Sequence, residues 1–225
     1  MTVWEPQSNT WASAGSVSRN KEPIANALDE YLEARESASF THILEIASGF
    51  GDHVRVFAGR HPEMTFQPTE AQRECLETLS QIRQANVLPP RKLNVLDDND
   101  WGALKSAQSR FDGIININMI HISPPASTEA LFKHATTLLT EDGFVFLYGA
   151  YLSEDGTFAS AADERFDASL KERDAAFGLR HPGDVDATAR KYNFTRVVSK
   201  TMALNNRIFI WRYTGQTGQR IRPDA

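Results

Sequence analysis

The sequence has one cysteine, no long apolar run and no excess of basic residues, and each shortage excludes a class of protein. Cys75 alone forms no disulfide within the chain and no thiolate zinc site. The longest apolar stretches, such as GFVFLYGAYL, are about half a membrane span. Lys and Arg number 24 against 29 Asp and Glu, and this net charge of −5 argues against nucleic-acid binding through bulk charge. The six His residues lie far apart, without an H-x-H or H-E-x-x-H motif, so we expect no metal site.

The composition that remains is that of an ordinary globular protein. Hydrophobic residues make up 41% of 225 residues, which is enough for one domain with a sizeable core. The start, MTVWEPQSNTW, has neither a basic residue nor an apolar run, so it is not a secretory signal, and a cytoplasmic protein is expected. We divide the chain into an irregular lead-in (1–18), one domain (19–213) and a mobile tail (214–225).

Hydrophobic periodicity predicts strands that alternate with helices along the domain. The expected strands are 42–46, 64–68, 91–97, 111–122, 143–151, 193–204 and 206–213, and the expected helices are 20–33, 52–60, 70–84, 128–139 and 166–174. The polar stretch 153–165 is interpreted as a loop or lid. This alternation is typical of an α/β fold with a mostly parallel sheet covered on both faces, and the last two strands are suited to antiparallel pairing. Ligands of such sheets bind beyond the carboxyl ends of the strands.

A glycine turn follows the first of these strands. Glu45, Ala47, Gly49 and Gly51 form the pattern E-x-A-x-G-x-G, which resembles the cofactor turn of class I S-adenosylmethionine (SAM) methyltransferases. A dinucleotide-binding fingerprint would need a third glycine where Val54 stands. A carboxylate inside an apolar strand must be paired or must serve a ligand amine. The alternative is an ordinary strand-to-helix turn in which the Glu is satisfied by the protein.

Two further acids follow the next strands. Glu70 lies just past the second strand, where an acid can accept both ribose hydroxyls, although a helix-capping role explains it nearly as well. Asp97 ends the third predicted strand, where it can accept from an adenine amino group. Asp98 and Asp100 stand beside it, so a solvated acidic loop is the equal alternative.

Several motifs, in order, resemble the DUF938 family, a group with a SAM-dependent methyltransferase-like fold that includes the methyltransferase-like 26 proteins. They are RNKEPI from Arg19, LEIASGFG, NMIHISP, FLYGAY, FDASLKERD and the pair Asn205-Asn206, and they extend over about residues 11–212. The resemblance implies one Rossmann-like domain with a seven-stranded, mostly parallel sheet and a C-terminal antiparallel strand. It also implies SAM as cofactor, with S-adenosylhomocysteine as product.

The chain departs from the family at three places around the expected acceptor site. The turn usually reads S-G-T-G-Q-H, and here it is SGFGDH, which keeps both glycines. The family's S-P-W-E is replaced after Pro124 by Pro125, Ala126 and Ser127, and its P-S-N before F-D-A-S-L is replaced by a longer ASAADER stretch. These changes favour a specialised acceptor.

The predicted acceptor site centres on the ends of the fourth and fifth strands. His121 is the candidate base or acceptor-orienting donor, because imidazole titrates near neutral pH. Asn118 and Met119 are candidates to line the cofactor's methionine and adenine. Tyr148 and Tyr151 flank the fifth strand's end and are predicted to cap the site, since aromatic rings suit a sulfonium cation. Structural packing is the alternative for all five residues.

Two polar clusters complete the prediction. Arg19, Asn20 and Lys21 resemble the family's first motif and could clamp the cofactor carboxylate, or could be a solvated helix start. Asn205 and Asn206 are suited to a hairpin turn, because Asn tolerates a positive φ.

Three functions remain open on the sequence alone. The first is a SAM-dependent methyltransferase acting on a small molecule at O, N or C. The second binds SAM as a fixed cation and steers a cyclisation or rearrangement. The third is a non-catalytic binding protein, which the acid and two glycines of the turn argue against. The expected partner is a small molecule, with no nucleic acid and no membrane. A homodimer is left open, because the sequence does not indicate the oligomeric state.

Overall fold

The computed structural model describes residues 14–35, 40–107 and 110–215. Its helices are α1 (Ala14–Glu33), α2 (Asp52–Arg60), α3 (Arg73–Leu79), α4 (Asp98–Ala107), α5 (Pro125–Leu138), α6 (Ala161–Arg173) and α7 (Pro182–Lys191), with 3-10 turns η1 (Ile120–Ile122) and η2 (Ala203–Asn205). Its strands are β1 (His42–Ile46), β2 (Thr65–Glu70), β3 (Arg91–Lys92), β4 (Phe111–Ile117), β5 (Leu139–Ala150), β6 (Phe194–Thr201) and β7 (Asn206–Tyr213).

The strands of the described chain form one seven-stranded sheet in the order β3-β2-β1-β4-β5-β7-β6. The pairs from β3 to β5 are parallel, whereas β7 runs antiparallel to both β5 and β6. The predicted mostly parallel sheet and the antiparallel C-terminal pair are therefore confirmed. The order reverses between β1 and β4, and this is the position at which α/β sheets bind ligands.

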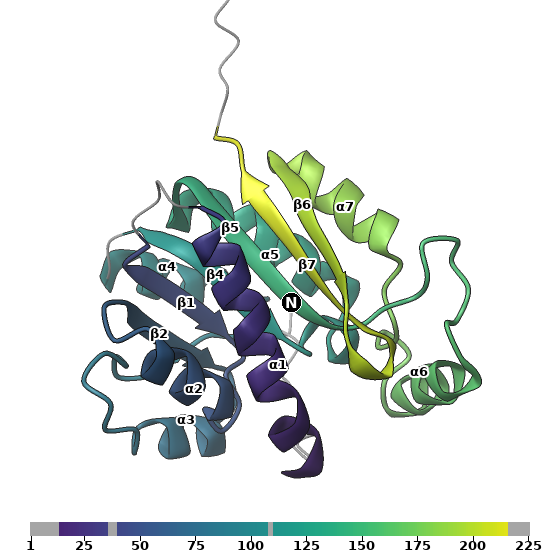
Figure 1. Cartoon of the computed structure of the whole chain (residues 1–225), viewed down its shortest axis with the longest axis horizontal. Coiled ribbons are helices and arrows are strands. Elements are labelled where there is room, and N and C mark those ends of the chain that lie inside the picture. The colour runs from purple at the N-terminus through teal and green to yellow at the C-terminus, as the bar shows by residue number, and fades with distance from the viewer. Residues whose placement is uncertain (1–13, 36–39, 108–109, 216–225) are drawn as a thin grey trace, which may run out of the picture.

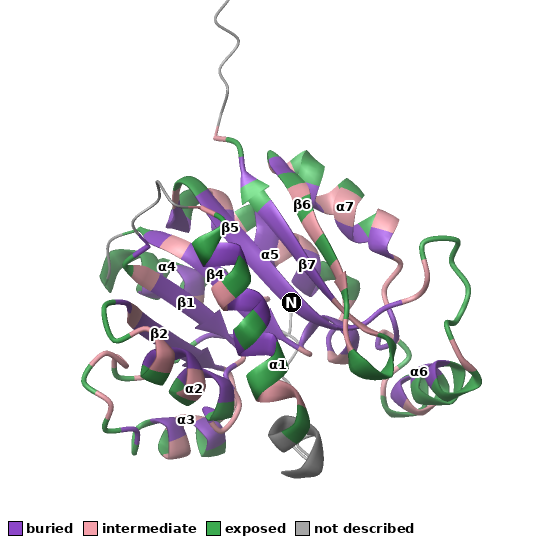
Figure 2. Cartoon of the chain, viewed as in Figure 1, coloured by how far each residue is buried: buried purple, intermediate pink, exposed green. Residues whose placement is uncertain are grey.

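Two apolar cores cover the two faces of the sheet (Figure 1; Figure 2). Side chains of α1, α2 and α3 pack on one face, which we call the α1 face. Side chains of α4, α5 and α7 pack on the other, which we call the α5 face. Successive residues of a strand point to opposite faces, so both faces of the central strands are apolar. None of the helices in the described residues is long and apolar enough to cross a bilayer.

Several predicted boundaries are wrong at the N-terminal side. Helix α1 begins at Ala14, before the predicted start near Asn20, so residues 14–18 do not belong to an irregular lead-in. Pro23 consequently lies inside the helix instead of in its first turn. Strand β3 ends at Lys92 because the chain turns at Asn94, whose side-chain oxygen accepts the N–H of Leu96 at 3.1 Å. Such local bonds compete with the sheet ladder.

The region after β5 is more helical than predicted. Helix α6 begins at Ala161, inside the stretch assigned to a loop, because the hydroxyl of Ser160 accepts the N–H of Asp163 and caps it. Helix α7 was not predicted, although Pro182 at its first position and the capping side chain of His181 are ordinary start signals. In Figure 1, α6 lies beyond the end of the sheet, beside the tip of the β6–β7 hairpin. The predicted tail includes residues 216–225, which lie outside the described residues.

Candidate functional site

The glycine turn lies between β1 and α2, where the sequence predicts it. Ala47, Gly49 and Gly51 all have positive φ, at 56°, 56° and 85°. A Cβ on Gly51 would approach Leu79 Cδ2 to 2.8 Å, so glycine is required there for both its φ and the space. The N–H of Ser48 donates to Thr69 O at 2.9 Å, which ties the turn to the carboxyl end of β2.

Glu45 is buried on the α1 face of β1, one residue before the strand ends. Burial raises the pKa of its carboxyl from 4.5 to about 8, and the neighbouring Glu70 and Asp52 contribute in the same direction. Its Oε2 has no hydrogen-bond partner among the described residues. The predicted alternative of a Glu fully satisfied by the protein is therefore wrong for this oxygen, which needs a donor.

Glu70 is the last residue of β2, because that strand continues two residues beyond its predicted end. Its Oε2 accepts the N–H of Gly49 at 2.9 Å, and its Oε1 accepts the N–H groups of Ala71 and Gln72 at 2.8 and 3.3 Å. The carboxylate thus faces the glycine turn, where a ribose contact was predicted, and it also holds the backbone that leads to α3. Both predicted roles remain compatible with this geometry.

Asp97 was predicted to end a strand, but it immediately precedes α4. Its Oδ1 accepts the N–H of Asn99 at 2.9 Å, which is the capping arrangement of an acid before a helix. The alternative of a solvated acidic loop is also wrong, because Asp98 and Asp100 form the first turn of α4 and one Asp97 oxygen caps that helix.

The segment after β4 carries three predicted site residues. The strand ends at Ile117 because Asn118 adopts a φ of 66°, and the Asn118 N–H donates to Tyr148 O at 2.8 Å. Met119 is buried and packs in the core of the α5 face. Asn118, Met119 and His121 are therefore at the carboxyl end of β4, as predicted, but in a turn and not in the strand.

His121 lies in η1 and is 4% exposed. Its Nδ1 has no partner in the described part of the chain, and its ring stands edge-on to Phe166, with centroids 5.7 Å apart. Burial lowers the pKa of the imidazole to about 4, and the charge of Arg180 lowers it further. His121 is thus neutral at physiological pH.

Arg180 fixes the segment that carries His121. Its guanidinium donates to Ile120 O at 3.0 Å, to Ser123 O and to Ala176 O at 3.0 Å. Its carbonyl accepts the Leu152 N–H at 3.0 Å. Sequence reasoning missed this residue, because nothing in the sequence indicates that residues about 60 apart are joined by side-chain-to-backbone bonds.

Tyr148 and Tyr151 do not form a common cap. Tyr148 packs in the core of the α1 face, whereas Tyr151 packs in the core of the α5 face, edge-on to Phe209 with centroids 4.8 Å apart. The two tyrosines are three positions apart, and strand residues an odd number of positions apart point to opposite faces of the sheet. The alternation itself therefore argues against a cap that both rings form together. Burial raises the pKa of both phenols.

Of the predicted cluster of Arg19, Asn20 and Lys21, Asn20 is the residue that contacts other candidate site residues. Its Oδ1 lies 3.2 Å from His53 Nε2, and its side chain also bonds Tyr148. Arg19 is exposed and Lys21 is half-buried. His53 was not predicted as a site residue, although it directly follows the turn. Burial lowers its pKa to about 4, and the charge of Lys21 acts in the same direction.

Comparisons with known proteins agree with this geometry. A family model described as a protein of unknown function, DUF938, matches residues 11–213. An O-methyltransferase family protein from Burkholderia thailandensis superposes with a TM-score of 0.66 at 12% identity, over 91% of this chain and 61% of that one. Human N-acetylserotonin methyltransferase in complex with SAM gives 0.67 at 13% identity, over 87% and 52%. LepI in complex with SAM gives 0.60 at 9% identity, over 79% and 44%.

This chain therefore corresponds to between 44% and 61% of the length of these three solved proteins. At identities of 9–13% the likeness shows the fold alone, which is the Rossmann-like fold of class I SAM-dependent methyltransferases. The predicted fold is thereby confirmed.

Proposed function

The chain belongs to the DUF938 family, and from this premise we propose that it binds SAM and transfers the methyl group to a small-molecule acceptor. One observation carries the proposal, namely the buried Oε2 of Glu45, which lacks a partner within the described residues beside the glycine turn. Ionising a buried carboxylate without a counter-charge is costly, so the group that suits it is a cationic amine. The amino-acid end of SAM carries such an amine.

The other residues at the carboxyl ends of β1 and β2 fit a nucleoside. The Glu70 carboxylate accepts the N–H of Gly49, and we assign it to the ribose hydroxyls. The first turn of α2 presents backbone N–H groups toward the same region, which suits a carboxylate. Asn118 and Met119 are assigned to the cofactor's adenine and methionine, and Asp97 retains one oxygen for the adenine amino group.

When bound, SAM supplies a methyl group on a cationic sulfur, which is already activated for an in-line displacement. The work of the chain is then to orient the acceptor and to exclude water. His121 is the residue assigned to the acceptor. Its imidazole is neutral, so it can accept a hydrogen bond, but with a pKa of about 4 it is a weak base and removes a proton only from an acceptor group that is already acidic.

The low pKa of His121 also favours a second candidate, which is a SAM-dependent cyclisation or rearrangement without methyl transfer. Such a reaction needs no strong base, because a fixed cation polarises the substrate. Release of S-adenosylhomocysteine in amounts equal to product distinguishes methyl transfer from this alternative.

Isothermal titration of the cofactor-free protein with SAM and with S-adenosylhomocysteine tests the proposal. We expect micromolar binding of both, and loss of both in Gly49→Val, because a β-branched residue at a φ of 56° distorts the turn. Gly102→Val is the matched control, since a Cβ there meets nothing within 4 Å. Circular dichroism establishes that each variant is folded. Normal SAM binding by a folded Gly49→Val variant would place the cofactor elsewhere, and no binding by the unaltered protein would remove the basis of the proposal.

A further inference from the structure

The exposed large apolar side chains of the described residues all fall in the C-terminal third of the chain. They are Phe158, Phe166, Val197 and Leu204, with exposed fractions of 36%, 39%, 44% and 77%. Phe158 and Phe166 flank the start of α6, and Leu204 is at the tip of the β6–β7 hairpin. Phe158, Phe166 and Leu204 are thus on neighbouring segments, whereas Val197 lies in β6 away from the tip. Exposed apolar groups that gather in one place indicate a binding surface.

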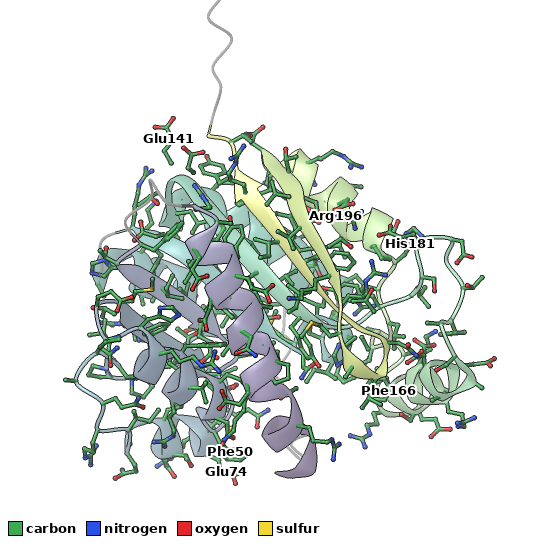
Figure 3. The ribbon with its side chains drawn as sticks, in the orientation of Figure 1. Phe50, Glu74, Glu141, Phe166, His181 and Arg196 are labelled. Atoms are coloured by element: carbon green, nitrogen blue, oxygen red, sulfur yellow. The ribbon has the colours of Figure 1, made fainter. Side chains whose placement is uncertain are left out.

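Hydrogen bonds join the hairpin tip to α6, and a ring contact joins α6 to His121. The side-chain amide of Asn205 donates to Asp163 Oδ2 at 2.9 Å and to Ser160 Oγ at 3.3 Å. Phe166 follows Asp163 by three residues and so lies one turn along the same face of α6. The ring of Phe166 stands against the imidazole of His121. In Figure 3, Phe166 is labelled where α6 faces the hairpin tip.

The end of β5 brings the hairpin and His121 together from the other side. Asn206 is the register partner of Ala150, so the hairpin tip starts beside the last residue of β5. A Cβ on the preceding Gly149 would lie 3.0 Å from His121 Nδ1, so the imidazole packs closely against backbone there. Leu204 is held at a φ of 56°, which is costly for a bulky residue and is typical of functional sites.

The charged groups near His121 are already engaged. Arg180 is the charge that acts on its imidazole, and the guanidinium is bound to three backbone carbonyls. Asp167, which acts on Arg180, is paired with Lys171 and accepts the Leu179 N–H at 2.8 Å. Arg180 and Lys171 are thus held by the protein's own oxygens, so neither is free to pair with an anionic acceptor.

We propose that the acceptor is a flat, uncharged aromatic hydroxyl compound, held by Phe166 and Leu204 with its hydroxyl on His121. This inference rests on the proposed function and adds the substrate class. In the reaction, the hydroxyl oxygen forms a bond to the methyl carbon of the sulfonium donor. The carbon–sulfur bond breaks and its electron pair stays on sulfur. The hydroxyl proton passes to His121 and then to solvent.

The basicity of His121 supports a phenol over an aliphatic alcohol. A phenol has a pKa of about 10, whereas an unactivated hydroxyl such as that of water has a pKa of about 16. An imidazole with a pKa of about 4 assists proton loss from the phenol far more readily. Aromatic acceptors also gain edge-to-face or stacked contacts with Phe166.

Binding of 2-naphthol to the protein saturated with S-adenosylhomocysteine, followed by calorimetry, tests the proposal without depending on turnover. We expect binding of 2-naphthol that is at least about 10-fold weaker in Phe166→Ala and in Leu204→Ser, and retained in Phe166→Tyr. SAM affinity should be unchanged in all three. Val197→Ser, which removes an exposed apolar side chain of β6, is the matched control and should bind as the unaltered protein does.

Cyclohexanol and 4-hydroxybenzoate, as an aliphatic alcohol and an anionic phenol, should bind at least about 10-fold more weakly than 2-naphthol. Equal binding of either compound would overturn the assigned substrate class. Equal weakening by Val197→Ser, or no binding of 2-naphthol by a protein that binds SAM, would overturn the assigned surface. Failure to bind SAM at all would refute the proposed function instead, so the two failures are distinguishable.

Discussion

Glu45 makes the stability of the cofactor-free protein fall as pH rises, and its replacement by Gln isolates this effect. In the unfolded chain the carboxyl ionises near its ordinary value of 4.5, whereas in the folded protein its pKa is about 8. Between these values the unfolded state binds fewer protons than the folded state, so unfolding becomes easier with increasing pH. Each pH unit well inside this window costs about 1.4 kcal/mol, and because the slope is smaller near both pKa values the total between pH 5 and pH 8 is about 3 kcal/mol.

Glu45→Gln keeps the shape of the side chain and cannot ionise. We therefore expect the free energy of unfolding of the variant, relative to the unaltered protein, to rise by about 3 kcal/mol from pH 5 to pH 8. Urea unfolding at pH 5, 6.5 and 8, followed by tryptophan fluorescence, measures this difference. Glu33→Gln, at the exposed end of α1, is the control and should show no such trend. Parallel pH curves for Glu45→Gln and the unaltered protein would refute the burial argument.

The same carboxyl connects stability to cofactor binding. If SAM binding ionises Glu45, then about 0.9 proton is released per SAM at pH 7, because a group with a pKa of about 8 is about nine-tenths protonated there. Calorimetry in two buffers of different ionisation enthalpy measures this number. Glu45→Gln should release none and should bind SAM about 10- to 100-fold more weakly, through loss of a charged hydrogen bond.

Three further changes test other parts of the site. His121→Ala should lower turnover at saturating SAM by about 10²-fold with SAM affinity unchanged, and at the same saturation the turnover of the unaltered protein should fall only as pH approaches 4; equal turnover of the variant would remove His121 from the reaction. Arg180→Met leaves three backbone carbonyls without their donor and should lower the free energy of unfolding by about 2 kcal/mol or more in urea, whereas no change would show that these bonds are replaced by water. Gly51→Ala should destabilise the protein by about 1–3 kcal/mol and Gly102→Ala should not, and equal stability of the two variants would contradict the crowded turn.

The sequence predicted the central strands, the glycine turn and α2 well, because these segments combine long apolar runs with a sharp glycine signal. Prediction from the sequence failed where local side-chain hydrogen bonds determine where a strand ends or a helix begins. Asn94 ends β3 early, Asn118 ends β4, and Ser160 begins α6 in a segment with little apolar periodicity. Such choices depend on single hydrogen bonds that periodicity does not register.

The geometry of the proposed cofactor side was easier to predict than that of the proposed acceptor side. Glu45, Gly49 and Gly51 lie within seven residues, so their geometry follows from one strand and one turn. The acceptor side is assembled from η1, α6 and the hairpin, which are distant in sequence. His121 was proposed from the sequence because imidazole is chemically distinctive. Phe166 and Leu204 were not proposed, since an apolar residue in a polar segment has no signal that separates exposure from packing.

The alternation of β5 explains how one sheet edge can serve two ligands. Tyr148 points to the α1 face, where Asn20 joins it to the residues after the glycine turn. Gly149 points to the α5 face, where the imidazole of His121 lies against it. Tyr148 and Glu45 are thus on the face opposite His121, whereas Asn118 lies on the same side as His121, with its Oδ1 3.7 Å from the position of a Cβ on Gly149. A side chain at position 149 would press on His121 Nδ1 at 3.0 Å and would approach Asn118 Oδ1 only to 3.7 Å, so Gly149→Ala should weaken binding of 2-naphthol more than binding of SAM. Loss of both ligands in that variant would show that the two sites share one face.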